Sequence, residues 1–472
     1  MKTVSIAIAL GMVAQSVGAI ADEFDFGKFR DRQLFEHAEE LFGIERPLSA
    51  ASSISVSAAT AEANPLSMVT LARGLRARVV SSQADLADHS DMLALWPDNI
   101  NPTHLIVCNE QGLGFAGVQR VNIATGAVAT ILSGTTLCDP AHVTPWGTVI
   151  IAEENGASGR MFEILDPLNT TGVTINNIDN STSDPTHVIY RPAVGRLSFE
   201  GVAIYPNGVM YYGDENRPSK GNGGGAYYKF IPTNLWGGGA PITNLNDSPL
   251  AYGQVYGLRL GKRNANTDYG HGTNIGLGVW VTIDNTDPNG VNLRAAAATY
   301  KLTGYYRPED IDIDGKALTN GQVRFCANNT GNEAFDRAWG ETICVTDGSM
   351  LDAATNAATP EVQYFVMGNR DFSMMDNIVF QPGRGNWVMH EDRDAVEMIG
   401  AGYPFNDSMW VCLEDGADAD TLSDGCVRIA TMNDFNTEST GGVFDASGKR
   451  FFFSLIHNVT GHGTILEVTG WK

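Results

Sequence analysis

The sequence predicts an all-β fold: a six-bladed β-propeller with insertions and an N-terminal helical extension. Glycine is abundant, with 52 of 472 residues, and charged residues make up only 18%, which suits many strands joined by turns. From about Leu105, short apolar runs alternate with turn-forming residues. These runs recur roughly every 40–70 residues, about the size of a four-stranded blade. An irregular sandwich is the alternative, whereas this spacing is too long for a β-helix.

The N-terminus has the pattern of a secretory signal. Lys2 is followed by an apolar run from Val4 to Val13, and Ala19-Ile20-Ala21 fits a small-residue cleavage site. We expect residues 1–21 to be removed by the general export route, because no twin-arginine pair is present. No other apolar run reaches the roughly 18 residues of a membrane span. The expected location is therefore periplasmic or extracellular, without a membrane span.

Two further regions follow the leader. Residues 22–64 are expected to be a helix and a linker, because Asp25 to Glu45 places apolar residues at helical spacing. The stretch RPLSAASSISVSAATAEANP is rich in Ala and Ser, which is typical of a linker or an extended strap. Residues 65–472 form the predicted propeller, and the motifs described below make it the expected catalytic domain.

Charge and cysteine content narrow the environment and the partners. A net charge of −23 repels nucleic acid and anionic membranes, and it repels phosphorylated substrates unless cations reverse the local field. Six cysteines fit an oxidising compartment. Their separations suggest the pairs Cys108–Cys138, Cys326–Cys344 and Cys412–Cys426, although spacing alone does not fix connectivity.

Several predicted strands end in carboxylates and amides. These strands are GTVIIAEEN, GVMYYGDEN, GQVRFCANN and GNWVMHEDRD, which end near Glu154, Asp214, Asn329 and Asp392, respectively. If these are the innermost strands of a propeller, their ends converge at one mouth of the channel. Carboxylates held that close require cations between them, and Ca²⁺ prefers such oxygen ligands. The alternative is that acidic strand ends only solvate loops.

The stretch RPEDIDIDG, Arg307 to Gly315, alternates aspartates in the same way as the first half of a calcium-binding loop. The bidentate Glu of a complete loop is missing, because its position holds Gly321. A partial calcium site and a solvated acidic face are the two interpretations.

The order of several motifs resembles that of the PhoX-type alkaline phosphatases. The blocks are TPWGTVIIAEENG, GRLSFEGVAIYPNGVMYYGDEN, YYRPEDIDI, RFCANNTG, MMDNIVFQPGRGNWVMHED and ESTGGVFDASGKRFFFSLIHN, spread from about Leu105 to the C-terminus. The resemblance implies a six-bladed propeller with calcium and iron on its axis. It also implies hydrolysis of phosphate esters outside the cytoplasm.

Carried over residue by residue, the resemblance implies a set of site residues. Arg307 and Glu309 are the catalytic candidates, and Arg307 and His457 are the substrate-binding candidates. The implied metal ligands are Cys138, Glu153, Glu154, Glu200, Asp214, Glu309 and Asp376. The segment CDPAHVTPWGT departs from the family pattern, because it lacks the usual glycine pair and contains Asp139, His142 and an apparent extra residue. The family's export signal is typically of the twin-arginine type, and its absence here, together with the candidate Cys108–Cys138 bridge, weighs against iron more than against calcium.

The expected function is a secreted, metal-dependent phosphatase that hydrolyses phosphate monoesters through a carboxylate-bound metal cluster. No G-x-S-x-G, Walker or H-E-x-x-H motif is present, which favours a metal-dependent reaction over a serine nucleophile. Small-molecule phosphate esters are the expected partners of a monomeric protein that does not bind nucleic acid. Two alternatives remain: a non-catalytic, calcium-stabilised binding propeller, and a metal-dependent propeller hydrolase of another class, such as a lactonase.

Overall fold

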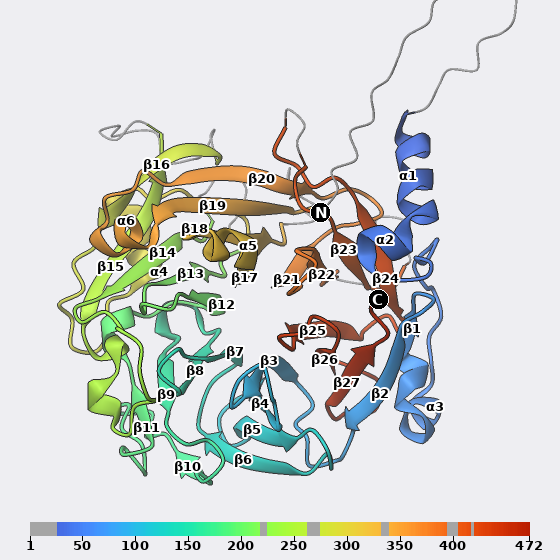
Figure 1. The fold of residues 1–472 in the computed structure, drawn as a ribbon. Helices are drawn as coiled ribbons and strands as arrows, with labels where there is room; N and C mark the ends of the chain where they lie inside the picture. The colour runs from blue at the N-terminus through green and yellow to red at the C-terminus, as the bar shows by residue number, and fades with distance from the viewer. Residues whose placement is uncertain (1–25, 218–223, 262–273, 332–338, 394–404, 417–419) are drawn as a thin grey trace, which may run out of the picture.

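The computed structural model is a propeller whose blades surround a common axis (Figure 1). It describes residues 26–217, 224–261, 274–331, 339–393, 405–416 and 420–472. The predicted signal peptide lies outside these residues. The strands divide into six blades that are antiparallel except for the parallel pair β6 and β10, and two of these blades join through β16 and β20 into one nine-stranded sheet. The prediction of an all-β propeller with six blades is confirmed.

Each blade begins with an inner strand beside the axis. The inner strands are β3 (Ser90–Trp96), β7 (Cys138–Val143), β12 (Phe199–Ile204), β17 (Pro308–Ile313), β21 (Met375–Phe380) and β25 (Glu438–Phe444). They contact one another in this cyclic order, and β25 returns to β3. The second strands are β4 (His104–Asn109), β8 (Val149–Glu153), β13 (Met210–Asp214), β18 (Gln322–Asn329), β22 (Trp387–Glu391) and β26 (Phe451–Ile456).

The remaining strands complete the blades on the outside. They are β5 (Ala116–Asn122), β6 (Val128–Ser133), β9 (Met161–Ile164), β10 (Val173–Thr174), β11 (Val188–Tyr190), β14 (Tyr227–Pro232), β15 (Gly253–Leu260), β16 (Gly276–Thr282), β19 (Glu341–Ser349), β20 (Glu361–Met367), β23 (Ser408–Cys412), β24 (Cys426–Met432) and β27 (Thr464–Thr469). Among the described residues, three short helices connect strands: α4 (Leu293–Tyr300), α5 (Gly315–Thr319) and α6 (Met350–Thr355).

Two N-terminal strands complete the last two blades. β1 (Val69–Leu71) pairs antiparallel with β24, and β2 (Arg76–Ser81) pairs antiparallel with β27. The start of the propeller is thus hydrogen-bonded to its end, which covers sheet edges that would otherwise be exposed. The ring is closed by backbone pairing as well as by side-chain packing.

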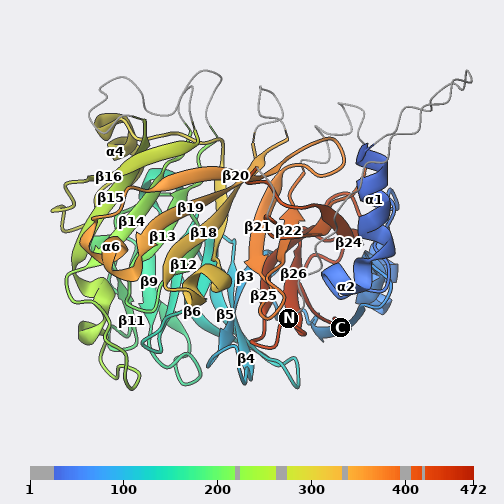
Figure 2. The ribbon, with the colours of Figure 1, turned by 45° about the horizontal axis from the view of Figure 1, so that its top comes forward.

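The N-terminal extension packs outside these last blades (Figure 2). It forms α1 (Phe26–Glu36), α2 (Ala38–Phe42) and α3 (Ala58–Ala63). The prediction of one helix from Asp25 to Glu45 is therefore wrong, because the helix breaks at His37 and Gly43 ends α2 in the left-handed region. The predicted linker also contains α3, whose first turn is capped by Ser57.

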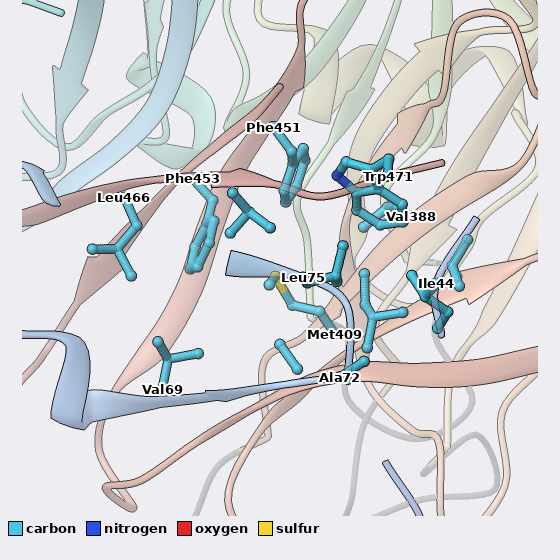
Figure 3. Close-up of a cluster of buried hydrophobic side chains, with 14 of the residues drawn as sticks. Ile44, Val69, Ala72, Leu75, Val388, Met409, Phe451, Phe453, Leu466 and Trp471 are labelled. Atoms are coloured by element: carbon cyan, nitrogen blue, oxygen red, sulfur yellow. The ribbon is translucent and has the colours of Figure 1, made fainter. Parts of the chain in front are cut away.

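A hydrophobic cluster fastens this extension to the propeller (Figure 3). Phe42 and Ile44 are fully buried together with Met409, Phe453 and Leu466 from the last two blades. Each fully buried side chain of this size contributes about 1.5–3 kcal/mol of hydrophobic free energy. The extension is therefore part of the folded body.

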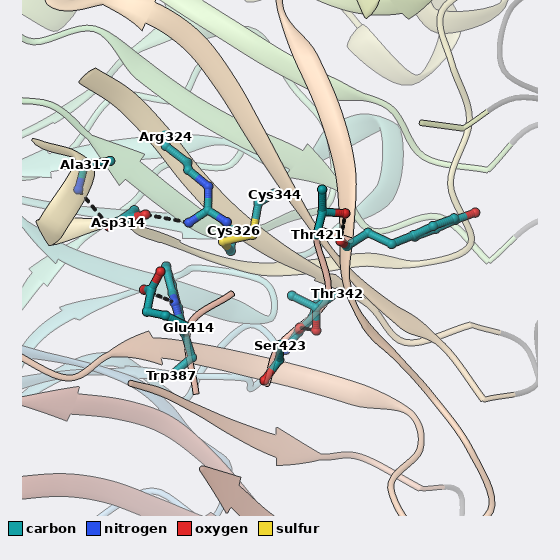
Figure 4. The surroundings of a disulfide bond; sticks show 12 residues. Asp314, Ala317, Arg324, Cys326, Thr342, Cys344, Trp387, Glu414, Thr421 and Ser423 are labelled. Carbon is teal, nitrogen blue, oxygen red and sulfur yellow. Dashed lines mark hydrogen bonds and ion pairs between the residues drawn. A yellow bond between two sulfur atoms is a disulfide. The ribbon is translucent and has the colours of Figure 1, made fainter. Parts of the chain in front are cut away.

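The three disulfides suggested by the cysteine spacing are present, and Figure 4 shows the surroundings of Cys326–Cys344. The pairs Cys326–Cys344 and Cys412–Cys426 cross-link neighbouring strands within one blade. Cys108–Cys138 instead joins β4 of the first blade to β7 of the second. No helix in the described ranges combines the length and apolar character needed to cross a bilayer.

Candidate metal centre on the propeller axis

Every inner strand begins with a carboxylate that faces the axis. In five blades it is the second residue of the strand, and in the sixth blade Glu438 is the first. The six residues are Asp91, Asp139, Glu200, Glu309, Asp376 and Glu438, and all line a cavity of about 190 Å³. The acids at equivalent positions therefore meet because the blades repeat around the axis.

A β-bulge follows the start of each inner strand. The ladder register between the inner and second strands shifts at Ser90/Leu93, Cys138/Ala141, Phe199/Val202, Pro308/Ile311, Met375/Ile378 and Thr440/Val443. A bulge inserts an extra residue and re-aims a side chain that regular pleating would point elsewhere. In five blades, the acid is one of the two inner-strand residues that lie between the bounds of the register shift.

The carboxylate-ending runs are second strands, so their interpretation as innermost strands is wrong. The second strands run antiparallel to the inner strands, and their C-terminal ends therefore lie beside the inner-strand starts. Glu110, Glu154 and Asp392, each just beyond such an end, also line the cavity. The predicted convergence of strand ends is present, but it supplies only the outer part of the site.

In three blades, two consecutive acids at a second-strand end have different environments. Side chains alternate between faces along a strand, so neighbouring acids point in different directions. The first acid of each pair is buried against an arginine: Glu153 with Arg160 at 2.6 Å, Asp214 with Arg294 at 2.7 Å and Glu391 with Arg393 at 2.6 Å. Of the second acids, Glu154 and Asp392 line the cavity, and Glu215 pairs with Arg307, which also lines it.

This alternation corrects two of the predicted metal ligands. Glu153 accepts from Arg160 and from the backbone N–H of Thr136, and Asp214 is held by Arg294. Neither residue lines the cavity or belongs to a group of side chains close enough to share an ion. Both are structural acids that anchor the strand ends.

Cys138 is also corrected as a metal ligand. Its sulfur is bonded to that of Cys108, so it is not available as a thiolate. The next residue, Asp139, points into the cavity and lies in one group with Glu154 and Glu200. Its buried Oδ1 has no hydrogen-bond partner. An oxygen ligand thus stands beside the position where a sulfur ligand was predicted.

Arg307 is the one arginine that lines the cavity within the described ranges. It immediately precedes β17 and has a left-handed backbone, with φ of 54°. Its Nε lies 2.8 Å from Glu215 Oε1 and 3.0 Å from Glu309 Oε1. Its Nη1 and Nη2 atoms lie only 3.3 and 3.5 Å from Asp392 Oδ2. The guanidinium is fixed at Nε, whereas its terminal nitrogens have weaker partners.

The cavity concentrates negative charge to an unusual degree. Nine carboxylic acids line it together with one arginine. Burial raises the pKa of Glu200 well above its usual range, and the neighbouring Asp139 and Glu309 raise it further. Burial and nearby carboxylates act in the same direction on the pKa values of Asp91, Asp139, Glu154, Asp376 and Glu438. Burial would also raise the pKa of Glu215, but Arg307 holds it below the ordinary value.

The carboxylates form overlapping groups that fit bound cations. The ligand atoms of Asp139, Glu154 and Glu200 lie within 4.8 Å of one another. The same holds for Glu200, Glu309 and Asp376, and for Asp376, Asp392 and Glu438. Glu200 and Asp376 each belong to two groups, so they could bridge neighbouring ions. This donor set contains only oxygen, which fits hard cations such as Ca²⁺.

The structure brings six of the predicted site residues into one cavity: Glu154, Glu200, Arg307, Glu309, Asp376 and His457. Sequence reasoning missed the lining residues Asp91, Glu110, Asp139, Asp392 and Glu438 as ligands. For Asp91, Asp139 and Glu438 the signal was an acid at the start of a short strand, as in SDMLALW and CDPAHV, whereas Glu110 and Asp392 directly follow second-strand ends. The aspartates of the DIDID stretch serve another purpose. Asp310 and Asp312 accept from the backbone N–H groups of Ile378 and Phe380, and so join the fourth blade to the fifth.

Comparisons with known proteins give a consistent result. The model of a family described as alkaline phosphatase PhoX matches residues 110–458. No curated protein sequence gives a significant match. The structure of Pseudomonas fluorescens PhoX in complex with vanadate, a transition-state analogue, is similar, with a TM-score of 0.60 and 14% identity over 89% of this chain and 97% of that chain.

Two other similar structures have lower scores. An aldose sugar dehydrogenase from Streptomyces coelicolor has a TM-score of 0.41 and 12% identity, over 85% of this chain and 98% of that chain. A gluconolactonase from Xanthomonas campestris has a TM-score of 0.41 and 13% identity, over 90% of this chain and 96% of that chain.

Proposed function

Because the chain belongs to the alkaline phosphatase PhoX family, we propose that it hydrolyses phosphate monoesters at the axial cavity with bound metal ions. The observation that carries this proposal is the ring of six inner-strand carboxylates next to Arg307. A phosphate ester is an anion, and nine surrounding acids would repel it. Cations bound among the acids would remove this repulsion and attract the ester.

The residues present fit calcium and do not fit a thiolate-bound iron. The unpartnered Oδ1 of Asp139 is an orphaned buried acceptor of the kind that a hard cation would satisfy. Cys138 is bonded to Cys108 and is not a free thiolate ligand. We propose Asp139, Glu154, Glu200, Glu309, Asp376 and Glu438 as the calcium ligands. Calcium bound to them would supply positive charge for the non-bridging oxygens of the phosphate.

Arg307 is the proposed phosphate-binding residue. Glu215 and Glu309 fix its Nε, so the planar guanidinium keeps one orientation. Its two terminal nitrogens can exchange their longer contacts with Asp392 for a bidentate contact with phosphate. Asp392 is itself an acid, so it competes with the phosphate for these two nitrogens, and its longer contacts make it the weaker competitor.

Glu309 links the phosphate-binding arginine to the cation-binding acids. One of its oxygens accepts from Thr330 Oγ1 at 2.8 Å, and the same oxygen contacts Arg307. Its carboxylate also belongs to the group with Glu200 and Asp376. We propose that it fixes the position of the arginine relative to the cations, so its loss would disturb both.

We also propose that the protein acts outside the cytoplasm. All six cysteines are in disulfides, which persist in oxidising compartments. The predicted signal peptide supports the same location. The monomeric state stays a prediction.

The test is turnover of a chromogenic aryl phosphate monoester by protein purified without chelators. We expect activity that is lost on chelation, restored by calcium, inhibited by vanadate and much weaker on the matching diester. Glu200→Gln and Arg307→Lys should each lower activity, whereas Glu361→Gln, at an exposed position of β20, should not. Absence of metal-dependent turnover in the purified protein would reject the proposal.

A further inference from the structure

Two histidines and one glutamate meet at the junction between the first and last blades. His89 precedes β3, Glu110 follows β4 and His457 follows β26. One ligand atom from each residue lies within 4.8 Å of the other two. The blades are joined at this point by a hydrogen bond of 2.8 Å between the hydroxyls of Ser90 and Ser454. The three side chains therefore lie where the first and last blades are hydrogen-bonded to each other.

The orientation of the imidazoles suits metal coordination. The two rings lie edge to face, with centroids 4.4 Å apart and an interplanar angle of 70°. Nδ1 of His89 lies 3.1 Å from the backbone oxygen of Glu110, to which it can donate a hydrogen bond. That donation leaves Nε2 with the lone pair that a metal requires. Metal-ligating histidines characteristically donate their other ring nitrogen to a carbonyl or carboxylate in this manner.

His457 occupies a costly backbone conformation. Its φ is 52°, in the left-handed region that few residues other than Gly adopt, although Asn, Asp and His do so several-fold more often than the rest. Such strain costs on the order of 1 kcal/mol and often accompanies a functional position. The residue directs its ring to the wall of the axial cavity, which it lines with Glu110.

We propose that His89, Glu110 and His457 bind one divalent transition metal of the zinc class at the wall of the axial cavity. Two imidazoles and one carboxylate suit zinc or cobalt, whereas calcium prefers oxygen alone. The site is thus chemically distinct from the carboxylate ring. Three protein ligands leave a position open to water or substrate. His457, predicted as a substrate-binding residue, would act on substrate through this metal.

Cobalt binding to the full chain in saturating calcium tests the proposal. Calcium occupies the oxygen-only groups, so cobalt should report on the histidine site through its visible absorption bands. We expect one cobalt per chain in the wild-type protein. The variants His89→Gln and His457→Asn should weaken its binding at least about tenfold, a loss that even removal of outer hydrogen-bond partners produces at metal sites. Asn is chosen at 457 because it tolerates the left-handed backbone.

Controls separate this site from folding and from the hydrolytic activity. His187→Gln changes a half-exposed histidine that pairs with Asp184 in an outer loop of the second blade, so it should leave cobalt binding unchanged. Calcium-induced stabilisation should persist in all three variants, which shows that they fold. X-ray absorption of the zinc-loaded protein should show imidazole scattering. An all-oxygen shell, displacement of cobalt by calcium, or wild-type binding by both cavity variants would overturn the proposal. None of these readouts depends on turnover, so the hydrolytic proposal could fail separately.

Discussion

Glutamine substitutions at the consecutive residues Glu153 and Glu154 should have opposite effects on the chelated protein. Glu153 is fully buried and paired with Arg160, so removal of its charge leaves an arginine buried without its partner. Glu154 lies among like charges, with Asp139 and Glu200 in its group. Removal of its charge therefore relieves repulsion. The comparison isolates environment, because the two changes are chemically identical.

The magnitudes follow from these distances. Two carboxylates whose oxygens lie within 4.8 Å of each other repel by at least about 3.5 kcal/mol at an effective dielectric constant of about 20. Proton uptake limits the total cost for one group to about 5 kcal/mol near pH 8, from an unfolded pKa of about 4.3 and about 1.4 kcal/mol per pH unit. We therefore expect Glu154→Gln to stabilise the chelated protein by about 3 kcal/mol. Glu153→Gln should destabilise it by about 3–5 kcal/mol, the typical cost of breaking a buried pair.

Thermal unfolding at about pH 8, with chelator and with calcium, measures both effects. The unfolding entropy of a chain of this length is about 1 kcal/mol per kelvin, so Tm should rise about 3 °C for Glu154→Gln and fall about 3–5 °C for Glu153→Gln. With calcium, Glu153→Gln should still lower Tm. Glu154→Gln should show a smaller calcium-induced increase than the wild type. A lower Tm for Glu154→Gln in chelator would refute the reasoning that Glu154 belongs to a repulsive cluster.

Three further predictions concern pH, the arginine and the disulfide. Folding raises the pKa of Glu200 and its neighbours, so their contribution to stability is complete below about pH 4 and is lost as pH rises through the folded pKa. Tm of the chelated protein should therefore fall from about pH 5 to about pH 8. A flat Tm profile that calcium leaves unchanged would contradict this. Arg307→Lys keeps the positive charge but loses the bidentate contact with phosphate, which is worth about 3 kcal/mol, so kcat/KM for an aryl phosphate should fall about 100-fold. A decrease of less than about threefold would exclude the proposed contact. Thiol titration of the denatured, non-reduced protein should detect no free sulfhydryl, whereas two per chain would indicate that Cys108 and Cys138 are unpaired.

The fold could be predicted from the sequence more completely than the candidate site. Turn signals and apolar runs predicted blades because each blade repeats the same local chemistry. The break at His37 was missed, because the apolar spacing continues across it and only the backbone conformation interrupts the helix. The role of the first acid in each strand-end pair was missed for a related reason. Whether Glu153 or Glu154 faces the axis depends on strand register, and the arginine that pairs with Glu153 is visible only in the folded chain.

The acids on the inner strands were harder to find than those at the second-strand ends. In a regular strand, side chains alternate between the two faces of the sheet, so the rest of the strand would determine the direction of Asp91 or Asp376. A bulge at each of these residues changes that direction. Bulges depend on the partner strand, so one strand's pattern does not reveal them. Cys138 shows the limit of motif transfer in the same region. The motif suggested a ligand at that position, but Cys138 is in a disulfide, and the neighbouring Asp139, within the bulge, is the residue that reaches the cavity.

The pairing of β2 with β27 also determines when this centre can exist during synthesis. Arg76 is opposite Thr469, so the first and last parts of the propeller must meet before the ring is complete. Asp91 and Glu438 come from the opposite ends of that circle. A nascent chain stalled before its last blade would carry most of the acids but no enclosed cage for an ion. Capture of the proposed metal ions should therefore be a late event, after the last blade has formed, and deletion of β2 or of β27 should abolish it.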